Sequence, residues 1–330
     1  MNQSLIITTV PFGEASATPL TLLEGSRADF TINPLGRKLQ PSEVADIIGD
    51  HDIVIAGTEP ITADVMARCR NLKAICRVGI GLDSVDLLTA RDRGIAISYT
   101  PDAPSPAVAE LTLGLMIDAA RGICQVDAGM RQGKWARHMG RRLDLCTIGI
   151  FGTGRIGTRV VRHVKGAFPN ARILASDLLP NDDLNGQVEW SDLETILREC
   201  DIVSLHVPLT PETLNLIAAP QIATMKENAI LINTARGGII NENALAHALR
   251  NGIIAGAAVD VFETEPYTGE LTSVPNVILT CHMGSMTRDC RAQMEIEAAQ
   301  EALRFLNGQP LACPAPEEEY ELAKMKRRHS

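Results

Sequence analysis

A glycine-rich turn between an apolar run and an amphipathic segment most constrains the fold of this chain. The turn is Gly152-Thr153-Gly154-Arg155-Ile156-Gly157; it follows the run Ile148–Phe151 and precedes apolar residues at helical spacing. In such a turn the first glycine permits a sharp bend, the second lets the backbone approach a pyrophosphate, and the third allows close helix–strand packing. The pattern therefore predicts a dinucleotide-binding turn at a helix N-terminus, where N–H groups favour phosphate.

The next predicted strand, Arg172–Ser176, ends at Asp177. A carboxylate at this position can accept hydrogen bonds from ribose hydroxyls and repels a 2′-phosphate. Leu178 follows, where an arginine would accommodate that phosphate. The alternative is an incidental aspartate after a glycine turn, but the context favours NAD as the cofactor.

Short β-branched runs alternate with amphipathic segments along the chain, which is typical of α/β proteins. We expect two doubly wound parallel-sheet domains, because 330 residues are enough for two. A Rossmann-type NAD domain over residues 102–287 would be inserted in a flavodoxin-like substrate domain formed by residues 1–101 and 288–330. The expected strands are Leu5–Val10, Phe30–Asn33, Asp52–Ala56, Leu72–Cys76 and Ile95–Ser98, then Thr147–Phe151, Arg172–Ser176, Asp201–Val207, Ala229–Asn233, Ala255–Val261 and Val277–Thr280.

Helix signals lie between these strands. A long helix is expected over Ala107–Arg121 after a proline-rich approach, and the final helix over Arg288–Leu306. Ser191-x-x-Glu194 has the spacing of a capping box. The tail from Cys313 to Ser330 is rich in proline, glutamate and lysine, so we expect it to be loose.

The charge balance narrows the classes of partner. Lysine and arginine number 31 against 40 aspartates and glutamates, a formal net charge of −9, which argues against binding to nucleic acid. The apolar stretches are too short for a membrane span, and the N-terminus lacks the pattern of a signal peptide. The eight cysteines show no CxxC spacing, so we expect reduced thiols, no metal site and a cytoplasmic location.

Arg236, Glu265 and His282 each follow a predicted strand of the second domain. Ligands of open α/β sheets bind outside the carboxyl ends of strands, so these side chains can converge on one crevice. Taken singly, an arginine or glutamate after a strand is usually a surface charge, and a lone histidine is usually structural. The three together, in a chain with a dinucleotide turn, form a candidate catalytic set.

Hydride transfer to a 2-keto acid needs these residue types. A guanidinium can hold a carboxylate through two hydrogen bonds and polarise the neighbouring carbonyl. An imidazole can donate a proton to the developing alkoxide or remove one from an alcohol. A carboxylate bonded to that imidazole fixes its tautomer and keeps the acid form available.

Further motifs extend this pattern over roughly residues 50–310. They are Arg77-Val78-Gly79-Ile80-Gly81-Leu82-Asp83-Ser84-Val85-Asp86, Val108-Ala109-Glu110-Leu111, His206-Val207-Pro208-Leu209, Asn233-Thr234-Ala235-Arg236-Gly237, and Asp260-Val261-Phe262 leading to Glu265-Pro266. With these motifs the chain resembles the D-isomer-specific 2-hydroxyacid dehydrogenase family.

The resemblance implies a role for each matched residue. Arg236 would bind the substrate carboxylate and carbonyl, His282 would be the acid or base, and Glu265 would be its partner. Arg77 and the main chain of Val78, Gly79 and Ile80 would hold the substrate from the first domain. The NAD site would comprise Gly152, Gly154, Arg155, Ile156, Gly157, Asp177, His206, Val207, Pro208, Thr213, Thr234, Ala235, Arg236, Asp260, His282 and Gly284.

The resemblance also implies a homodimer. The segment Gly122–Cys146 is polar and basic and is not expected to lie in a core. In the family such an arm wraps the partner chain, and here it would bring Arg137 or His138 to the other subunit.

The first hypothesis for the substrate is 3-phosphoglycerate or a near relative, and the alternative is an unphosphorylated 2-keto acid. Within the family the chain looks most like 3-phosphoglycerate dehydrogenase in a short form without a regulatory domain, where Arg77 would help to hold a phosphate. Ala56 and Glu59 stand where some phosphoglycerate enzymes carry cations, which favours glyoxylate, hydroxypyruvate or another unphosphorylated 2-keto acid. A remote alternative from another class is an NAD-sensing, corepressor-like binding protein.

Overall fold

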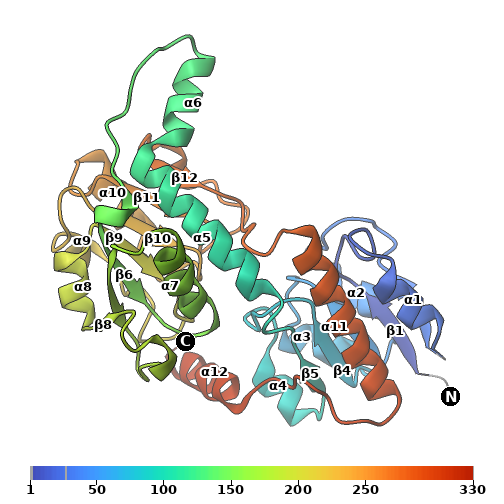
Figure 1. Cartoon of the computed structure of the whole chain (residues 1–330). Coiled ribbons are helices and arrows are strands. Elements are labelled where there is room, and N and C mark those ends of the chain that lie inside the picture. The colour runs from blue at the N-terminus through green and yellow to red at the C-terminus, as the bar shows by residue number, and fades with distance from the viewer. Residues whose placement is uncertain (1–2, 27, 330) are drawn as a thin grey trace. The chain divides into compact units, whose positions relative to one another are not determined.

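The computed structural model describes residues 3–26 and 28–329. The chain divides into two compact units, the first formed by Met1–Pro104 and Met286–Ser330 and the second by Ser105–Ser285. Each unit contains one sheet whose neighbouring strands run parallel (Figure 1), which confirms the predicted α/β class with two parallel-sheet domains. Among the described residues, none of the helices combines the length and the apolar character that a membrane crossing needs.

The sheet of the first unit has the strand order β2-β1-β3-β4-β5. Its strands are β1 (Ser4–Ile7), β2 (Asp29–Ile32), β3 (Ile53–Ala56), β4 (Ala74–Arg77) and β5 (Ala96–Ser98). Its helices are α1 (Thr18–Glu24), α2 (Val44–Ile48), α3 (Ala63–Arg68), α4 (Leu87–Asp92), α11 (Arg288–Leu306) and α12 (Glu317–His329). Every residue of the central strands β3 and β4 is buried, as expected for parallel strands that are covered on both faces.

The sheet of the second unit has the order β12-β11-β10-β9-β6-β7-β8. Its strands are β6 (Thr147–Phe151), β7 (Arg172–Ser176), β8 (Glu189–Trp190), β9 (Ile202–Leu205), β10 (Ile230–Asn233), β11 (Gly256–Val259) and β12 (Val277–Leu279). Its helices are α5 (Pro104–Arg121), α6 (Ile123–Arg131), α7 (Arg155–Ala167), α8 (Leu193–Glu199), α9 (Ala219–Ile222) and α10 (Glu242–Arg250), with short 3₁₀ turns η1 (Leu143–Leu145), η2 (Asp182–Leu184) and η3 (Glu270–Ser273).

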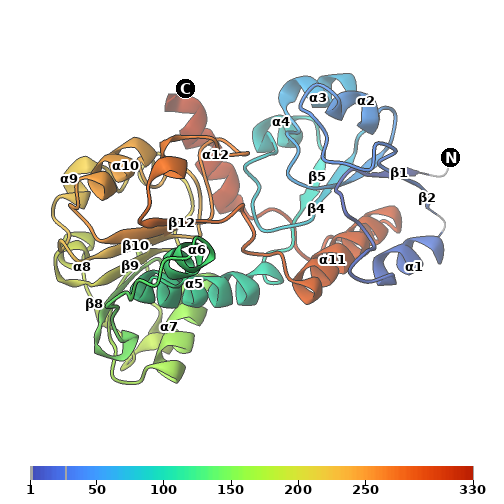
Figure 2. The same cartoon turned by 90° about the horizontal axis from the view of Figure 1, so that it is seen from above.

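Alternate residues of these strands enter two different cores. Leu231 of β10 packs in a cluster with residues of α8, α9 and α10, whereas Ile230 and Ile232 pack in a cluster with residues of α5 and α7. Figure 2 shows α9 and α10 on one face of this sheet and α5 and α7 on the other. Because both faces are covered, the edge at the carboxyl ends of the strands is where side chains reach a ligand.

The prediction of a loose C-terminal tail is wrong for residues 313–329, and Ser330 lies outside the described residues. Ala315 donates its main-chain N–H to the carbonyl of Ile97, 2.8 Å away, so the tail pairs with the edge strand β5. The following helix α12 is fixed to α4, because the Arg91 guanidinium stacks on the Tyr320 ring at 3.5 Å and bonds Glu317. Tyr320 belongs to the core of the first unit.

Two helix starts also differ from the predictions. The N-cap of α8 is Asp192, whose carboxylate accepts the N–H of Thr195 at 2.7 Å. The predicted capping box at Ser191 is therefore wrong by one residue, because the helix begins at Leu193 and the residue before it, Asp192, supplies the cap. Helix α5 begins at Pro104 rather than Ala107, since proline is readily accommodated in the first turn of a helix.

Candidate active site

The three candidate catalytic residues lie in loops at the carboxyl ends of neighbouring strands. Arg236 follows β10, Glu265 follows β11 and His282 follows β12, and these strands are adjacent in the sheet of the second unit. The candidate NAD residues of this unit follow β6, β7, β9, β10, β11 and β12, at the same edge. The fold therefore places both sets on one edge of one sheet.

His282 and Glu265 form a hydrogen-bonded pair. The Nδ1 atom of His282 lies 2.8 Å from Oε2 and 3.0 Å from Oε1 of Glu265. Since a carboxylate only accepts, Nδ1 carries the hydrogen, and Nε2 is the ring nitrogen that can exchange a proton with a substrate. The His282 side chain is 44% exposed, so the imidazole is accessible. This is the arrangement of an acid–base group that a carboxylate orients.

Asp260 holds the turn that carries His282. Its side chain is almost fully buried and accepts three hydrogen bonds: from the hydroxyl of Thr280 at 2.6 Å, the N–H of Met283 at 2.9 Å and the N–H of Gly284 at 3.0 Å. The Asp260 carbonyl accepts the N–H of His282 at 2.8 Å. These contacts stabilise the left-handed backbone of His282, whose φ is 54°. The sequence did not single out Thr280, because a threonine at a strand end carries no distinctive signal.

Arg236 lies in a loop that is fixed by Asn233. The Asn233 amide donates to the Arg236 carbonyl at 2.8 Å and accepts the N–H of Ala235 at 3.0 Å. A Cβ atom on Gly237 would lie 2.0 Å from the carbonyl carbon of Phe262, so only glycine lets this loop approach the loop of Glu265. Thr234 is buried, and its hydroxyl lies 2.8 Å from that of Thr112 on α5.

The glycine turn has the geometry that a pyrophosphate requires. Gly152 has a φ of 96°, and a Cβ there would lie 2.6 Å from the His206 carbonyl oxygen. A Cβ on Gly157 would lie 1.9 Å from the Gly152 carbonyl oxygen, whereas one on Gly154 would meet no atom within 4 Å. Packing thus requires glycine at positions 152 and 157. Gly154 leaves open space before the N-terminus of α7, which begins at Arg155. These residues fit a dinucleotide.

Asp177 is tied to the same turn. One carboxylate oxygen accepts the N–H of Thr153 at 2.6 Å and its hydroxyl at 3.0 Å, and the other accepts the N–H of Leu179 at 3.2 Å. The carboxylate therefore stands at the end of β7 beside the glycine turn, where a ribose would meet it.

The segment His206–Thr213 completes this edge. His206 is half-buried, and the Nε2 atom of its imidazole lies 2.9 Å from the Ser204 hydroxyl. Its Nδ1 has no hydrogen-bond partner among the described residues. Burial lowers the pKa of His206 to about 3, so the ring is neutral at ordinary pH. Thr213 fixes the segment by donating its hydroxyl to the Pro208 carbonyl at 2.7 Å.

The first unit carries the remaining predicted substrate residues, Arg77 to Ile80, after β4. Arg77 is only 5% exposed. Its guanidinium donates to the carbonyls of Gly57, Val78 and Gly81, the last at 2.8 Å and 3.0 Å. Gly79 has a φ of 136°, and its N–H donates to the Thr100 hydroxyl at 2.8 Å. Arg77 thus shapes the loop that follows it through main-chain carbonyls.

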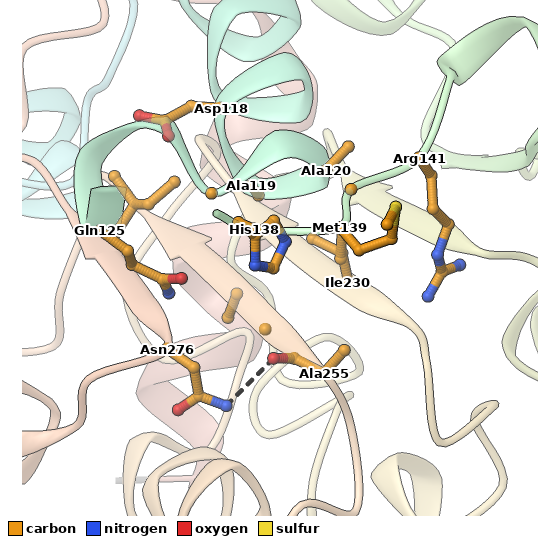
Figure 3. Close-up of a pocket in the computed structure, with 15 residues that line it drawn as sticks. Asp118, Ala119, Ala120, Gln125, His138, Met139, Arg141, Ile230, Ala255 and Asn276 are labelled. Atoms are coloured by element: carbon orange, nitrogen blue, oxygen red, sulfur yellow. Dashed lines mark hydrogen bonds between the residues drawn. The ribbon is translucent and has the colours of Figure 1, made fainter. Parts of the chain in front are cut away.

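A separate hollow of about 180 Å³ lies at the opposite, amino-terminal end of β10 and β11 (Figure 3). Its wall includes Gln125 and His138 from α6 and the loop after it, and Asn276 before β12. None of the candidate catalytic or NAD residues lines it. The hollow therefore lies where the segment 122–146 joins the sheet of the second unit, and it is not part of the candidate active site.

Comparison with known proteins agrees with this geometry. Residues 113–284 match the family model of the D-isomer specific 2-hydroxyacid dehydrogenase NAD binding domain. The hydroxypyruvate reductase of Thermotoga maritima is 39% identical over 275 residues, which cover 81% of this chain and 89% of that protein. The chain belongs to the D-isomer-specific 2-hydroxyacid dehydrogenase family. It is an NAD-dependent enzyme of that family.

Two further relatives show the range of this family. The D-3-phosphoglycerate dehydrogenase of Methanocaldococcus jannaschii is 39% identical over 278 residues, which cover 82% of this chain but only 53% of that protein. The crystal structure of a glyoxylate reductase from Paecilomyes thermophila matches with a TM-score of 0.84 and 27% identity, covering 96% of this chain and 99% of that one. The names of the relatives thus differ in substrate while the fold is shared.

Proposed function

We propose that the protein reduces a small, unphosphorylated 2-keto acid with NADH and oxidises the corresponding D-2-hydroxy acid in the reverse direction. The family supports the reaction class. The His282–Glu265 pair carries the assignment, because it supplies an oriented proton donor on the same sheet edge as the glycine turn.

In this proposal NADH would supply the hydride to C2 of the 2-keto acid, and NAD would accept it from C2 of the hydroxy acid in the reverse direction. Arg236 binds the substrate carboxylate with two hydrogen bonds and polarises the C2 carbonyl. The Nε2–H of His282 donates its proton to the carbonyl oxygen as hydride reaches C2, and the product is the hydroxy acid. In the reverse direction Nε2 removes the hydroxyl proton, and Glu265 stabilises the imidazolium that forms.

The remaining assignments are those that the sequence indicates. Asp177 would bind the adenosine ribose, and the first turn of α7 would bind the pyrophosphate. Main-chain groups of Val78 to Ile80 would contribute to binding of the substrate carboxylate. Arg77 would act through the shape of that loop, since its donors already bond main-chain carbonyls.

The charges at the carboxyl edge of the first sheet support an unphosphorylated substrate. Arg77 is buried, and Arg291 bonds Glu295 at 2.5 Å and the Thr9 hydroxyl at 2.9 Å. Glu59 is also buried after β3, where it accepts the N–H of Gly57 at 2.9 Å. A phosphate dianion needs cations with unused donors, and a buried carboxylate would repel it.

Phosphohydroxypyruvate, the 2-keto acid that oxidation of 3-phosphoglycerate at C2 produces, is the second candidate. Identity to a D-3-phosphoglycerate dehydrogenase is as high as to a hydroxypyruvate reductase. In addition, Arg137 in the segment 122–146 is an exposed cation that a second subunit would offer.

Side-by-side measurement of kcat/KM for glyoxylate, hydroxypyruvate and phosphohydroxypyruvate, each with NADH and NADPH, tests the proposal. We expect turnover with NADH and a preference of at least about tenfold for an unphosphorylated acid. A preference for the phosphorylated acid would transfer the assignment to the second candidate. Absence of turnover with all three, with NADH binding intact, would refute the proposed reaction.

We also propose that the protein is a homodimer built through the arm formed by residues 122–146. Helix α6 contains no buried residue, and the arm projects from the second unit (Figure 1). Trp135 and Met139 are 79% and 96% exposed, which a monomer in water does not favour. Light scattering should give twice the chain mass for the native protein and a monomer for Trp135→Asp; a native monomer would contradict the proposal.

A further inference from the structure

Glu242 occupies a place where a glutamate is ordinarily solvated. It is the first residue of α10, directly after the N-cap Asn241, whose side chain accepts the N–H of Ala244 at 2.9 Å. A carboxylate in the first turn of a helix is normally explained by the helix dipole. Here the side chain is half-buried, and Oε1 accepts the main-chain N–H of Glu263 at 2.8 Å. Glu242 therefore contacts the loop that leads to Glu265.

That loop is held closely on several sides. Glu265 accepts the N–H of Phe262 at 3.2 Å, so its carboxylate folds back on its own loop. The Phe262 ring stacks on the Tyr267 ring with centroids 4.2 Å apart. A Cβ on Gly237 would lie 2.4 Å from the Glu263 nitrogen. The bond from Glu242 thus completes a frame that fixes where Glu265 meets His282.

The charge of Glu242 is not needed for this bond. The amide oxygen of glutamine would accept the same N–H, without repulsion from neighbouring carboxylates. Burial, and then the charges of Glu263 and Glu265, raise the pKa of Glu242. The fold thus keeps three carboxylates together at an energetic cost, and such costs are concentrated at functional sites.

We propose that Glu242 is a positioning residue for the Glu265–His282 pair: it fixes the Glu265 loop, and its negative charge favours the protonated imidazole. This rests on the proposed function, because it assigns Glu242 to that same site. Negative charges near an imidazole favour its charged form.

Other charged and titratable groups lie on the elements around this frame. Glu263, Glu265 and Tyr267 lie on the loop, and burial and then Glu242 and its neighbours raise the pKa of Tyr267. On the flanking loops stand Arg236, His282 and Asp260, the last buried and bonded to the His282 turn. At the far end of α10, Arg250 pairs with Glu270 at 2.5 Å.

Two substitutions separate the bond from the charge. E242Q keeps an acceptor for the Glu263 N–H and removes the charge, whereas E242A removes both. E227Q is the matched control, because Glu227 is an exposed glutamate in the same unit. Each protein is assayed as purified, with NADH and glyoxylate or hydroxypyruvate, whichever the wild type turns over, and with the corresponding hydroxy acid and NAD.

For E242Q we expect kcat to fall about threefold and the pH–rate curve to move to lower pH by about 0.3 to 0.5 unit. The alkaline limb of reduction, which needs the protonated imidazole, and the acid limb of oxidation, which needs the neutral one, should both move this way. For E242A we expect kcat to fall about tenfold or more with unchanged NADH affinity, and for E227Q neither change. A structural glutamate would lower the melting temperature of E242A without moving the curve of E242Q, and that result would overturn the proposal.

An NMR titration of His282 keeps this test independent of turnover. The His282 ring signal is identified by its loss in His282→Gln, and its titration midpoint is measured in the wild type and in E242Q. A lower midpoint in E242Q supports the proposal even if no 2-keto acid is reduced. Failure of the proposed reaction can therefore be distinguished from failure of the role proposed for Glu242. Identical midpoints overturn it.

Discussion

The two parallel sheets use the charged residues at their carboxyl edges in different ways. In the first unit, Arg77 and Glu59 are buried and direct their hydrogen bonds at their own loops. In the second unit, His282 is partly exposed and bonds Glu265 through Nδ1, which leaves Nε2 for chemistry. Position at a strand end therefore does not by itself make a charged residue catalytic; what matters is whether its donors and acceptors are already used.

The largest expected effect tests whether His282 in the second unit has a catalytic role. His282→Ala should lower kcat by about 10³-fold, because the proton donor is lost. NADH affinity, measured by fluorescence titration, should change little. His247→Ala, at an exposed position on α10, is the control and should keep wild-type kcat. A variant at position 282 with normal turnover would show that the pair has no catalytic role.

The next largest effect tests whether Arg77 in the first unit has a structural role. Arg77→Met should lower the free energy of unfolding by about 3 kcal/mol, because buried carbonyls lose their donor. Urea denaturation measures this loss. Arg68→Met is the matched control, since Arg68 is an exposed arginine of the same unit that pairs with Asp46, and it should stay within about 0.5 kcal/mol of the wild type. If both variants unfold alike, Arg77 is not a scaffold residue.

His206 sharpens the comparison, because its half-buried ring bonds the Ser204 hydroxyl within the catalytic unit. Burial lowers its pKa to about 3 in the folded state, against about 6.5 in an unfolded chain. Below pH 6.5 the unfolded chain therefore binds a proton that the folded protein does not, so stability falls as the pH falls. Between pH 7.5 and 5 this group should remove about 2 kcal/mol of stability.

Unfolding free energies at several pH values measure this slope. His206→Gln should lose it, whereas His247→Gln should keep it because His247 is exposed. Equal slopes in the wild type and His206→Gln would mean that the His206 ring accepts a proton in the folded protein.

The smallest effect concerns the cofactor. Asp177→Ala should lower the ratio of kcat/KM with NADH to that with NADPH by about tenfold, because a carboxylate repels the 2′-phosphate. Asp183→Ala, at an exposed position on the neighbouring turn, is the control. An unaltered ratio would leave Asp177 with only its bonds to Thr153 and Leu179.

Most strands of both sheets were predictable, because apolar β-branched runs are typical of buried strands. The short edge strand β8 (Glu189–Trp190) was missed, since its two residues carry no such run. The glycine turn was predictable for a related reason, since Gly157 must be glycine where a Cβ would lie 1.9 Å from the Gly152 carbonyl. Both signals are local. The pairing of Glu265 with His282 needed the family resemblance, because residues on separate loops meet only through the sheet order.

The features that the sequence did not indicate depend on distant contacts. Helix α12 has a glutamate- and lysine-rich composition that is typical of a solvated tail, yet Tyr320 packs in a core and against Arg91. An arginine in a sequence is usually read as a surface charge. Only the three-dimensional structure shows that the Arg77 guanidinium donates its hydrogen bonds to main-chain carbonyls. The local sequence pattern predicts neither the contacts of Tyr320 nor the carbonyls that Arg77 bonds.

The division of the chain has a consequence for synthesis on the ribosome. The second unit is one uninterrupted stretch, Ser105–Ser285, whereas the first is assembled from Met1–Pro104 and Met286–Ser330. The contacts of β5 with residues around Pro314, and of α4 with Tyr320, therefore form only after the whole second unit has been synthesised. The nucleotide-binding unit is free to fold while the other still lacks α11 and α12, so nascent chains should acquire protease resistance first over residues 105–285.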